Sequence, residues 1–446
     1  MKRKSTRLYL LIFILVTTYT HAQIVAVPAW SLQSNIYEVN LRQYSSSGSI
    51  KDFQKHLPRL RKMGVEILWF MPITPIGIEG RKMNVDELGS YYAVRNYKAV
   101  NEEFGTLADW KTLVTQAHSL GFKVITDWVP NHSAPDNPWI KNHPDFYAKD
   151  SLGNMIAPFD WTDVRKLNYA NRELRDSMID AMKFWLVETG TDGFRCDVAG
   201  EVPNDFWQEC ITALKKVKNV YMLAEGESPQ LHDAGFNTTY GWSMMTAMTD
   251  LYAGKKNLAQ FDSAVNKGIA DYPGNASRLF FTTNHDENSW NGTEFEKYGD
   301  AFKTFAVFTQ TMYQSIPLVY SGQELPNKKR LKFFVRDTIE WNGNYTMAPF
   351  YATLLHTRRN NRALASNASY EKITTGNDDN IFAFVRSAAK NKVVVVLNFS
   401  SLPQTFQLSH TLLKKGTGIF TGKKESLTTI NKKTLPPWGY LVYKVK

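Results

Sequence analysis

Four apolar runs of the chain each end in a polar segment: DWVPNH at Asp127–His132, GFRCD at Gly193–Asp197, AEG at Ala224–Gly226 and FTTNHD at Phe281–Asp286. We interpret each run as a strand of one parallel barrel, in which all strands end at the same rim. Three of the segments place a carboxylate at such an end. These carboxylates are therefore expected to converge, although they lie far apart in the sequence.

Short apolar runs alternate with helix-like stretches from about residue 34 to residue 360. The predicted strands are Asn35–Val39, Glu66–Met71, Lys123–Trp128, Asp192–Asp197, Tyr221–Glu225, Leu279–Asn284 and Leu318–Ser321, with a weaker one near Gly235–Tyr240. Predicted helices include Leu107–Leu120, Glu173–Glu188 and Phe206–Val217. Repeated βα units favour a parallel, helix-covered sheet, and eight of them favour a closed (β/α)₈ barrel. An open doubly wound sheet is the alternative, but no glycine-rich phosphate loop follows the first predicted strand.

The pattern breaks after the third predicted strand. Residues 132–163 are rich in Pro, Asn and Trp, lack a helical period and exceed the usual length of a βα loop. We predict an inserted subdomain there, so that the barrel comprises residues 23–131 and 164–360. Short β-rich runs separated by turn residues predict a C-terminal antiparallel β-sandwich over residues 367–446, with strands near Ile381–Arg386, Lys392–Phe399, Gly418–Phe420 and Gly439–Val445.

The first 22 residues have the features of a signal peptide. Basic residues precede an apolar run from Leu8 to Val16, and Ala22 is a small residue before the expected cleavage site. The run is shorter than the about 20 residues of a spanning helix. We therefore expect an exported protein, periplasmic or extracellular, that does not insert into a membrane after cleavage.

Net charge disfavours one class of partner, and the cysteine content disfavours disulfide bonds. The net charge of +11 falls to +7 without the four basic residues of the signal peptide, and no run of five or six like charges occurs. This pattern disfavours nucleic acid as a partner. The two cysteines do not make a disulfide framework. Cys196 falls in a predicted buried strand, so we expect a free thiol in the core rather than a bridge to Cys210.

The GFRCD segment suits a nucleophile. Arg195 and Asp197 are two residues apart on one strand, so both side chains point the same way. A guanidinium beside Asp197 favours the ionised carboxylate, which a nucleophile requires. Three convergent carboxylates flanked by Arg and His are what cleavage of a glycosidic bond needs, so Asp197 is the candidate nucleophile for that reaction. A structural Arg–Asp pair at the barrel rim is the alternative. Asp127 lies lower on its strand and is expected to be a structural partner of Arg195 or of a neighbouring group.

Two glutamates compete for the role of general acid. Glu225 ends its apolar run, and Glu227 follows two residues later on the same face. Between apolar strands and other carboxylates, Glu225 is expected to have a raised pKa and to stay protonated, so that it can donate to a leaving oxygen. Asp286 is the third carboxylate. Its expected role is to hold sugar hydroxyls and to strengthen that grip in an oxocarbenium-like transition state.

Histidine and tyrosine side chains complete the candidate site. His132 and His285 each lie in a strand-end segment beside an asparagine, which favours sugar binding over the core packing that is commoner for a lone histidine. Tyr92, within GSYYAVRNY at Gly89–Tyr97, is expected to form an aromatic platform for a sugar ring. Packing in the core is the alternative for this tyrosine.

With further motifs in the same order, these segments resemble the α-amylase family, glycoside hydrolase family 13. The further motifs are MPITP at Met71–Pro75, NEEFGT at Asn101–Thr106, WTDV at Trp161–Val164, IPLVYSGQE at Ile316–Glu324 and DTIEW at Asp337–Trp341. The resemblance runs from about Asn35 to the C-terminus. It implies a barrel, an inserted domain, a C-terminal β-sandwich and retaining chemistry on α-glucosidic bonds. Because the family's acid directly follows its strand, the resemblance favours Glu225 over Glu227. It also implies that Tyr92, His132, Arg195 and His285 bind substrate.

The sequence departs from the family pattern at two places. Many α-amylases carry Lys-His shortly after the nucleophile, touching the substrate and the calcium of the inserted domain, whereas this chain has Gly200 and Glu201. Asn131 matches a calcium ligand of the family, but its partners are hard to find in this short insertion. The resemblance therefore allows Ca²⁺ without requiring it. Asn96 stands where an acidic residue is usual.

The expected function is hydrolysis of α-1,4-glucosidic bonds in starch, glycogen or maltodextrins by double displacement. A transglycosylase or isomerase acting on α-glucans would use the same three carboxylates with a sugar hydroxyl as acceptor. A non-catalytic glucan-binding homologue would typically lack one of the carboxylates. All three are present here.

Overall fold

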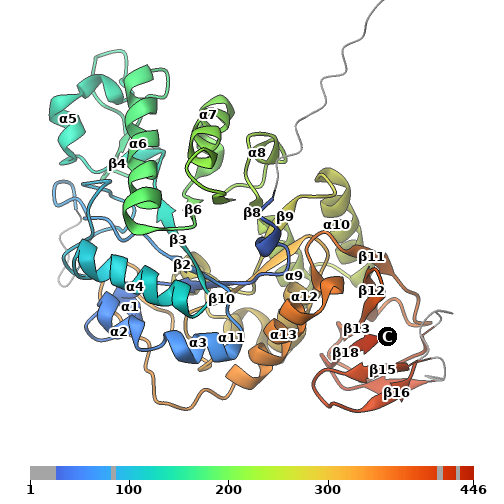
Figure 1. Cartoon of the computed structure of the whole chain (residues 1–446). Coiled ribbons are helices and arrows are strands. Elements are labelled where there is room, and N and C mark those ends of the chain that lie inside the picture. Colours follow the sequence, from blue (N-terminus) through green and yellow to red (C-terminus); the bar gives the residue numbers. More distant parts are fainter. Residues whose placement is uncertain (1–26, 82–86, 409–414, 428–431, 446) are drawn as a thin grey trace, which may run out of the picture.

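The computed structural model describes residues 27–81, 87–408, 415–427 and 432–445 (Figure 1). The predicted signal peptide, residues 1–22, lies outside the described residues. Within the described part of the chain, no helix is long and apolar enough to cross a membrane. Both cysteines, Cys196 and Cys210, are buried free thiols, as predicted.

Eight parallel strands of the described chain close into a barrel, which confirms the predicted (β/α)₈ architecture. In chain order they are β1 (Ile36–Val39), β2 (Ile67–Phe70), β3 (Lys123–Trp128), β6 (Gly193–Cys196), β7 (Tyr221–Ala224), β8 (Thr238–Tyr240), β9 (Ser277–Phe280) and β10 (Ser315–Tyr320). Their order around the barrel follows the chain, and β1 pairs with β10 to close it.

Two predicted strands were placed too late in the sequence. The prediction Leu318–Ser321 corresponds to β10, which begins at Ser315 and ends at Tyr320. The prediction Leu279–Asn284 corresponds to β9, which ends at Phe280. Phe280 pairs with Pro317 of β10, and proline has no N–H to donate to the ladder. The chain therefore leaves the sheet there, and the polar residues up to Asp286 lie beyond the barrel rim.

Helices surround the barrel and bury their apolar faces against it. The longer ones are α4 (Leu107–Ser119), α6 (Arg172–Thr189), α7 (Asn204–Lys215), α9 (Trp242–Tyr252), α10 (Leu258–Asp271), α12 (Phe302–Thr311) and α13 (Ala348–Asn360). Shorter ones are α1 (Leu41–Tyr44), α2 (Ile50–Gln54), α3 (Leu57–Met63), α8 (Gln230–Asp233) and α11 (Glu294–Tyr298).

Local sequence sets the helix ends. Thr106 and Asp109 form a capping box that satisfies free N–H groups at the start of α4. Gly190 ends α6 with a left-handed φ of 77°, a conformation in which glycine avoids the strain of a side chain. These signals explain why both helices lie within two residues of their predicted bounds.

The segment between β3 and α6 leaves the barrel wall and returns to it. Two short strands, β4 (His132–Ser133) and β5 (Arg165–Lys166), pair in antiparallel fashion at its base. Between them lies the short helix α5 (Pro138–Asn142), followed by irregular chain. The insertion predicted over residues 132–163 thus begins at β4, directly beside the rim of β3.

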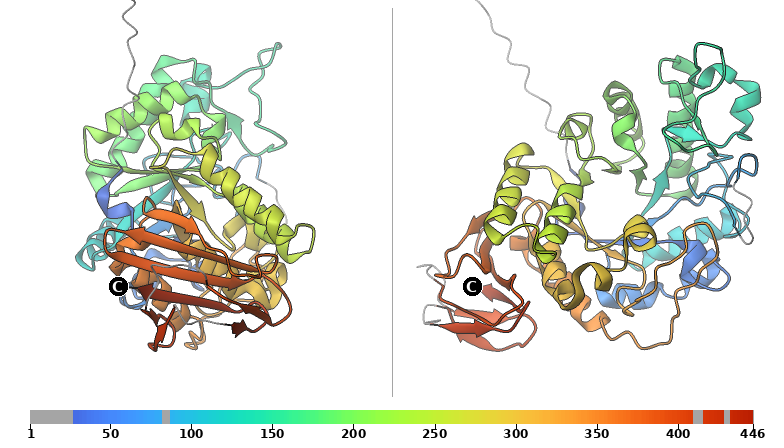
Figure 2. Two further views of the ribbon diagram at one scale, coloured as in Figure 1. Left: turned by 90° about the vertical axis from the view of Figure 1, so that its right-hand side faces the viewer. Right: turned by 180° about the vertical axis from the view of Figure 1, so that it is seen from behind.

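The C-terminal part forms antiparallel sheets to one side of the barrel, in red in Figure 2. A six-stranded sheet has the order β11-β12-β13-β18-β15-β16, and β14 pairs with β17. The bounds are β11 (Ser369–Lys372), β12 (Ile381–Ala388), β13 (Asn391–Asn398), β14 (Gln404–Phe406), β15 (Lys415–Gly418), β16 (Lys424–Ser426), β17 (Lys433–Leu435) and β18 (Tyr440–Val445). The strand predicted at Gly418–Phe420 is wrong beyond Gly418, because the chain turns there and the Gly418 N–H bonds to Lys423 O.

The two faces of the six-stranded sheet pack against different partners. Val394 and Val396 face a cluster that includes Phe406 of β14 and Leu435 of β17. The alternate residues Val393 and Val395 face a cluster that includes aromatic side chains of α10 and α12. Because side chains alternate along a strand, β13 is buried on both faces and reads as a continuous apolar run.

Candidate active site

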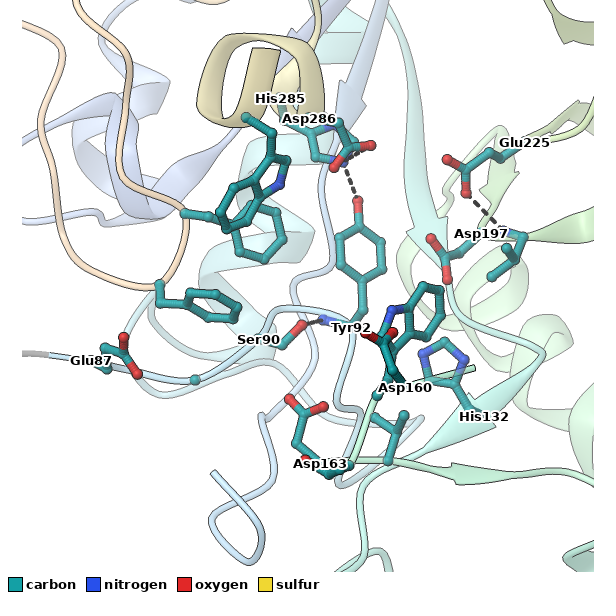
Figure 3. A pocket seen from close by; sticks show the side chains of 18 residues that line it. Glu87, Ser90, Tyr92, His132, Asp160, Asp163, Asp197, Glu225, His285 and Asp286 are labelled. Atoms are coloured by element: carbon teal, nitrogen blue, oxygen red, sulfur yellow. Dashed lines mark hydrogen bonds and ion pairs between the residues drawn. The ribbon is translucent and has the colours of Figure 1, made fainter. Parts of the chain in front are cut away.

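A cavity of about 460 Å³ opens at the carboxyl ends of the barrel strands (Figure 3). Six of the eight predicted site residues line it: Tyr92, His132, Asp197, Glu225, His285 and Asp286. The other two, Arg195 and Asn131, are buried and do not line it. The strand ends therefore bring together the three carboxylates that the sequence places 28 and 61 residues apart.

Strand register explains why the carboxylates meet. Cys196 of β6 pairs with Ala224 of β7, so the next residues, Asp197 and Glu225, leave adjacent strands at the same level. Gly193 permits this close pairing, because a Cβ there would lie 1.9 Å from the Tyr221 carbonyl oxygen.

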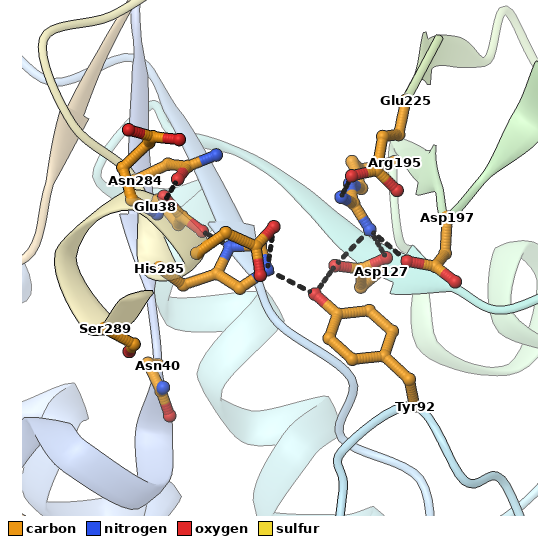
Figure 4. A network of polar contacts seen from close by, with 12 residues as sticks. Glu38, Asn40, Tyr92, Asp127, Arg195, Asp197, Glu225, Asn284, His285 and Ser289 are labelled. Carbon is orange, nitrogen blue, oxygen red and sulfur yellow. Dashed lines mark hydrogen bonds and ion pairs between the residues drawn. The ribbon is translucent and has the colours of Figure 1, made fainter. Parts of the chain in front are cut away.

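Arg195 lies between the carboxylates of Asp127, Asp197 and Glu225 as their common cation (Figure 4). Its Nη1 atom donates to Asp127 Oδ1 at 3.0 Å and to Asp197 Oδ1 at 2.9 Å. Its Nη2 atom lies 3.0 Å from Glu225 Oε1, as an ion pair whose N–H is not directed at that oxygen. The predicted contact between Arg195 and substrate is not supported, because the side chain is fully buried. The predicted partnership of Arg195 with Asp127 is confirmed.

The pKa values of Asp197 and Glu225 shift in opposite directions. Burial raises the pKa of Asp197 well above its usual value, and the charge of Glu225 adds to the rise. Burial also acts to raise the pKa of Glu225, but Arg195 and the Val198 N–H outweigh it and lower that pKa. The direction for Glu225 is opposite to the predicted rise, because Arg195 reaches across to Glu225, a contact that its spacing from Asp197 does not reveal.

A strained residue follows Asp197. Val198 has φ 40° and ψ 42°, a left-handed conformation that is a genuine outlier for a β-branched side chain. Its N–H donates to Glu225 Oε2 at 2.8 Å. Such strain costs about 1–3 kcal/mol and persists where the surrounding structure imposes it. Here the strained turn after β6 gives Glu225 its second partner.

Tyr92 and His285 form the wall opposite Asp197 and Glu225. The Tyr92 hydroxyl lies 2.8 Å from His285 Nε2 and donates to Asp127 Oδ2 at 3.2 Å, and the two rings stack with centroids 5.8 Å apart. Burial alone would lower the pKa of His285, but Asp286 and Glu38 raise it to about 9. His285 is therefore a cation at neutral pH, beside Asp286 Oδ2 at 3.3 Å.

The second histidine, His132, is neutral, unlike the cationic His285. His132 lies at the start of the insertion, at the end of the cavity near Trp161, with ring centroids 5.4 Å apart. Burial lowers its pKa to about 3. It is therefore a neutral hydrogen-bonding group at every pH at which the protein is expected to work.

The structure separates the two candidate acids. Glu225 lines the cavity, whereas Glu227 does not. Glu227 instead pairs with Arg278 and accepts hydrogen bonds from the N–H and the hydroxyl of Ser243. Both partners lie outside the cavity, so the contacts of Glu227 are structural.

Sequence reasoning missed the aromatic side chains at the mouth of the cavity. Trp161 comes from the insertion. On the opposite wall, Trp290 comes from a short π-helical segment, Glu287–Asn291, and Phe333 and Phe334 come from a loop. Trp161 and Trp290 remain 39% and 55% exposed. Among the described residues, the exposed large aromatic side chains are these two and Phe159, whose ring contacts Trp161. The high Trp content was visible in the composition, but nothing in the sequence placed these rings at the mouth.

Asn131 is the residue for which the resemblance allows a calcium role. It is buried, and its Nδ2 atom lies 3.3 Å from His132 Nδ1. Calcium takes six to eight oxygen ligands from carboxylates, carbonyl groups and water. No cluster of three or more acidic, histidine or cysteine side chains suited to a metal occurs among the described residues. The calcium role of Asn131 stays a prediction, and we derive no step through calcium.

Comparison with known proteins identifies relatives along most of the chain. The sequence model for "Alpha amylase, catalytic domain" matches residues 34–154 and 155–379, and that for "Maltogenic Amylase, C-terminal domain" matches residues 370–442. The alpha-amylase MalA of Haloarcula japonica is 27% identical over 400 residues, which cover 85% of this chain and 57% of that protein. A cyclomaltodextrinase of a Bacillus species is 25% identical over 377 residues, which cover 79% of this chain and 65% of that protein.

Solved structures agree with this relationship. The maltogenic alpha-amylase AmyB from Thermotoga neapolitana superposes with a TM-score of 0.84 at 29% identity, covering 93% of this chain and 98% of that chain. This chain spans less than two thirds of the length of the two relatives compared by sequence.

Proposed function

This chain belongs to the α-amylase family, glycoside hydrolase family 13, and from that premise we propose that it hydrolyses α-1,4-glucosidic bonds of starch, glycogen or maltodextrins with retention of configuration. One observation carries the proposal: Asp197, Glu225 and Asp286 converge on one cavity, and Arg195 holds the first two. Retaining glycosidases need two neighbouring carboxyl groups with different protonation states.

The reaction follows a double displacement. In the first step an Asp197 oxygen bonds to the anomeric carbon, the glycosidic C–O bond breaks and its electrons go to the leaving oxygen, which takes a proton from Glu225. In the second step Glu225 removes a proton from water, and the water oxygen bonds to the anomeric carbon as the Asp197 ester breaks. Two inversions return the sugar to the α configuration.

The first step needs ionised Asp197 and protonated Glu225. In the free site the two pKa values are shifted against this arrangement, because burial and the charge of Glu225 raise that of Asp197 whereas Arg195 and the Val198 N–H lower that of Glu225. A leaving oxygen beside Glu225 offers the proton an acceptor there, and the released charge on Asp197 is then held by Arg195 at 2.9 Å.

The remaining wall residues hold the sugar. Asp286, beside cationic His285, accepts hydrogen bonds from sugar hydroxyls, and the Nε2 edge of His285 faces the same cavity. Neutral His132 bonds to a hydroxyl at the other end of the cavity. The Tyr92 ring provides a flat apolar surface for one face of the pyranose.

The aromatic rings at the mouth support an oligosaccharide substrate. Trp161 and Trp290 lie on opposite sides of the opening and keep much of their surface exposed. Exposed aromatic side chains of this size mark binding surfaces. A glucan chain that enters the cavity would cover both.

A product time course tests the proposal. Maltoheptaose is incubated with the protein, with Asp197→Asn and with Glu225→Gln, and the products are separated by chromatography. Shorter maltooligosaccharides with the wild type, and a loss of about 10³-fold or more with either variant, are expected. Products longer than the substrate would identify a transglycosylase instead. No change with the wild type would overturn the proposed substrate.

Export is a separate proposal that rests on residues 1–22. The N-terminal sequence of protein recovered from the medium or periplasm of an expressing bacterium should begin at about Gln23. Protein that stays in the cytoplasm and begins at Met1 would contradict it.

A further inference from the structure

Glu38 is a buried acid that the proposed mechanism leaves without a role. It lies in β1, on the inside of the barrel, and its side chain is fully shielded from solvent. Its Oε1 atom lies 2.5 Å from His285 Nδ1, and its Oε2 atom has no hydrogen-bond partner among the described residues. Burying a carboxylate is costly unless it is paired, so the contact with His285 is the interaction that retains it.

This contact fixes which edge of the His285 ring faces the cavity. Nδ1 points to Glu38, and Nε2 points to the Tyr92 hydroxyl at 2.8 Å and to Asp286 Oδ2 at 3.3 Å (Figure 4). The His285 ring also packs edge-to-face against Trp69 of β2, with ring centroids 5.9 Å apart and an interplanar angle of 82°. This contact limits rotation of the imidazole. The ring is therefore held by a partner on the side remote from the cavity.

Charged groups from every neighbouring element act on His285. Glu38 and Asp286 are the anions in direct contact. The charge of His285 also lowers the pKa values of Asp127 on β3 and of Glu225 after β7. Arg195 on β6 is the cation that lowers the pKa of His285. Tyr320 on β10 and Tyr92 are neutral phenols, because burial raises the pKa of both above their usual value.

Building on the proposed function, we propose that Glu38 is a positioning residue, which orients His285 from behind and supplies the negative charge that keeps this imidazole protonated. Protonated His285 places its Nε2–H at the cavity wall and its positive charge beside Asp286. Burial raises the pKa of Asp286, and the His285 charge is the largest influence that opposes this rise. Glu38 thus acts on Asp286 through His285, without touching the cavity.

The test compares Glu38→Gln with the wild type. Glutamine keeps an acceptor for Nδ1 and removes the charge, so the ring stays oriented while its proton is lost more easily. We expect the pKa of His285, followed by NMR of ¹³Cε1-labelled histidine, to fall from about 9 by about one pH unit or more.

Activity should follow this shift. With α-maltosyl fluoride, whose leaving group needs no acid, kcat/KM of Glu38→Gln should match the wild type near pH 5. It should fall about twofold or more below the wild type at pH 8. A purely structural role would lower kcat/KM equally at both values of pH.

Glu294→Gln is the matched control. Glu294 is another fully buried glutamate, bonded to Thr282 and Gln323, and it does not line the cavity. Its replacement should leave the His285 titration unchanged.

Two outcomes would overturn the proposal. The first is a His285 pKa at or below 6.5 in the wild type, which can be measured even if Glu38→Gln does not fold. The second is the same His285 pKa in the wild type and in Glu38→Gln. The NMR titration needs no turnover, so it remains decisive if maltoheptaose and maltosyl fluoride prove not to be substrates.

Discussion

Arg195 sets the charge distribution at the scale of single residues. One guanidinium contacts Asp127, Asp197 and Glu225, and it is fully buried. Three carboxyl groups around one cation cannot all be ionised at low cost. The Val198 N–H donates to Glu225 and lowers its pKa, whereas the charge of Glu225 raises the pKa of Asp197. The charge states of the nucleophile and the acid are therefore linked.

Removing the charge of Glu225 should make Asp197 easier to ionise. In Glu225→Gln the carboxylate that raises the pKa of Asp197 is gone, so this pKa should fall by about one pH unit or more. The burst of fluoride released from α-maltosyl fluoride needs ionised Asp197 but no acid. Its rate should rise with pH at a lower pH in Glu225→Gln than in the wild type. A burst rate that rises at the same or a higher pH in Glu225→Gln would contradict the inference that the charge of Glu225 raises the pKa of Asp197.

Truncating the aromatic side chains at the mouth should weaken binding of long substrates. An aromatic stacking contact contributes about 0.5–1.5 kcal/mol beyond area burial, so Trp161→Ala and Trp290→Ala should each raise KM for maltoheptaose about tenfold. The KM of α-maltosyl fluoride should change less, because a disaccharide reaches fewer rings.

Leu402→Ala supplies the control for this experiment, since Leu402 is 63% exposed and does not line the cavity. Equal effects of the tryptophan variants on long and short substrates would show that the rings do not bind outer sugars.

At the scale of elements, one buried acid joins the ends of several barrel elements. Asp192 precedes β6 and accepts from the Val124 N–H of β3 at 2.9 Å. Its side chain also pairs with His118 of α4, with Lys123 and with Lys218. Burial acts to raise the pKa of Asp192, but these partners lower it to about 2. The carboxylate thus ties β3, β6 and two helix ends together on the face opposite the cavity.

Asp192→Asn should destabilise the barrel at neutral pH. A fall of the pKa from 3.8 to about 2 corresponds to about 2 kcal/mol. Because the folded-state pKa is lowered, this stability is present above pH 3.8 and is lost as the pH falls through 2. Calorimetry should show a lower Tm than wild type at pH 7 and convergence of the two near pH 2.

The exposed variant Asp180→Asn, which loses only a surface pair with Lys98, should change Tm little. A Tm for Asp192→Asn that equals the wild type at pH 7 would show that Asp192 does not stabilise the barrel.

At the scale of the molecule, the barrel and the C-terminal sheet share one apolar cluster. Phe261 of α10 and Phe308 of α12 pack against Phe382 of β12 and Phe399. Beside them the buried Arg386 donates to carbonyl oxygens of residues 311, 312, 365, 368 and 369. The junction is thus built like a domain core and not like a mobile linker.

A chain that ends at Asn367 should therefore aggregate. Without the sheet, Phe261, Phe305 and Phe308 of the shared cluster face solvent, and an exposed patch of this kind promotes association. Light scattering should detect aggregates in the truncated protein and not in the full chain. A soluble monomer with the Tm of the full chain would show that the barrel folds independently.

The amino-acid sequence by itself determined the barrel, its helices and the identity of the carboxylates, because apolar periodicity and strand-end position are local properties. Asp197, Glu225 and Asp286 follow their runs in the sequence, and parallel strands in a barrel all end at one rim. Only the tertiary structure decided between Glu225 and Glu227 on physical grounds, linked the charge states of Asp197 and Glu225, and brought Glu38 against His285. Those outcomes depend on distances between side chains that lie 28 to 247 residues apart, and electrostatic interactions follow distance and burial rather than sequence spacing.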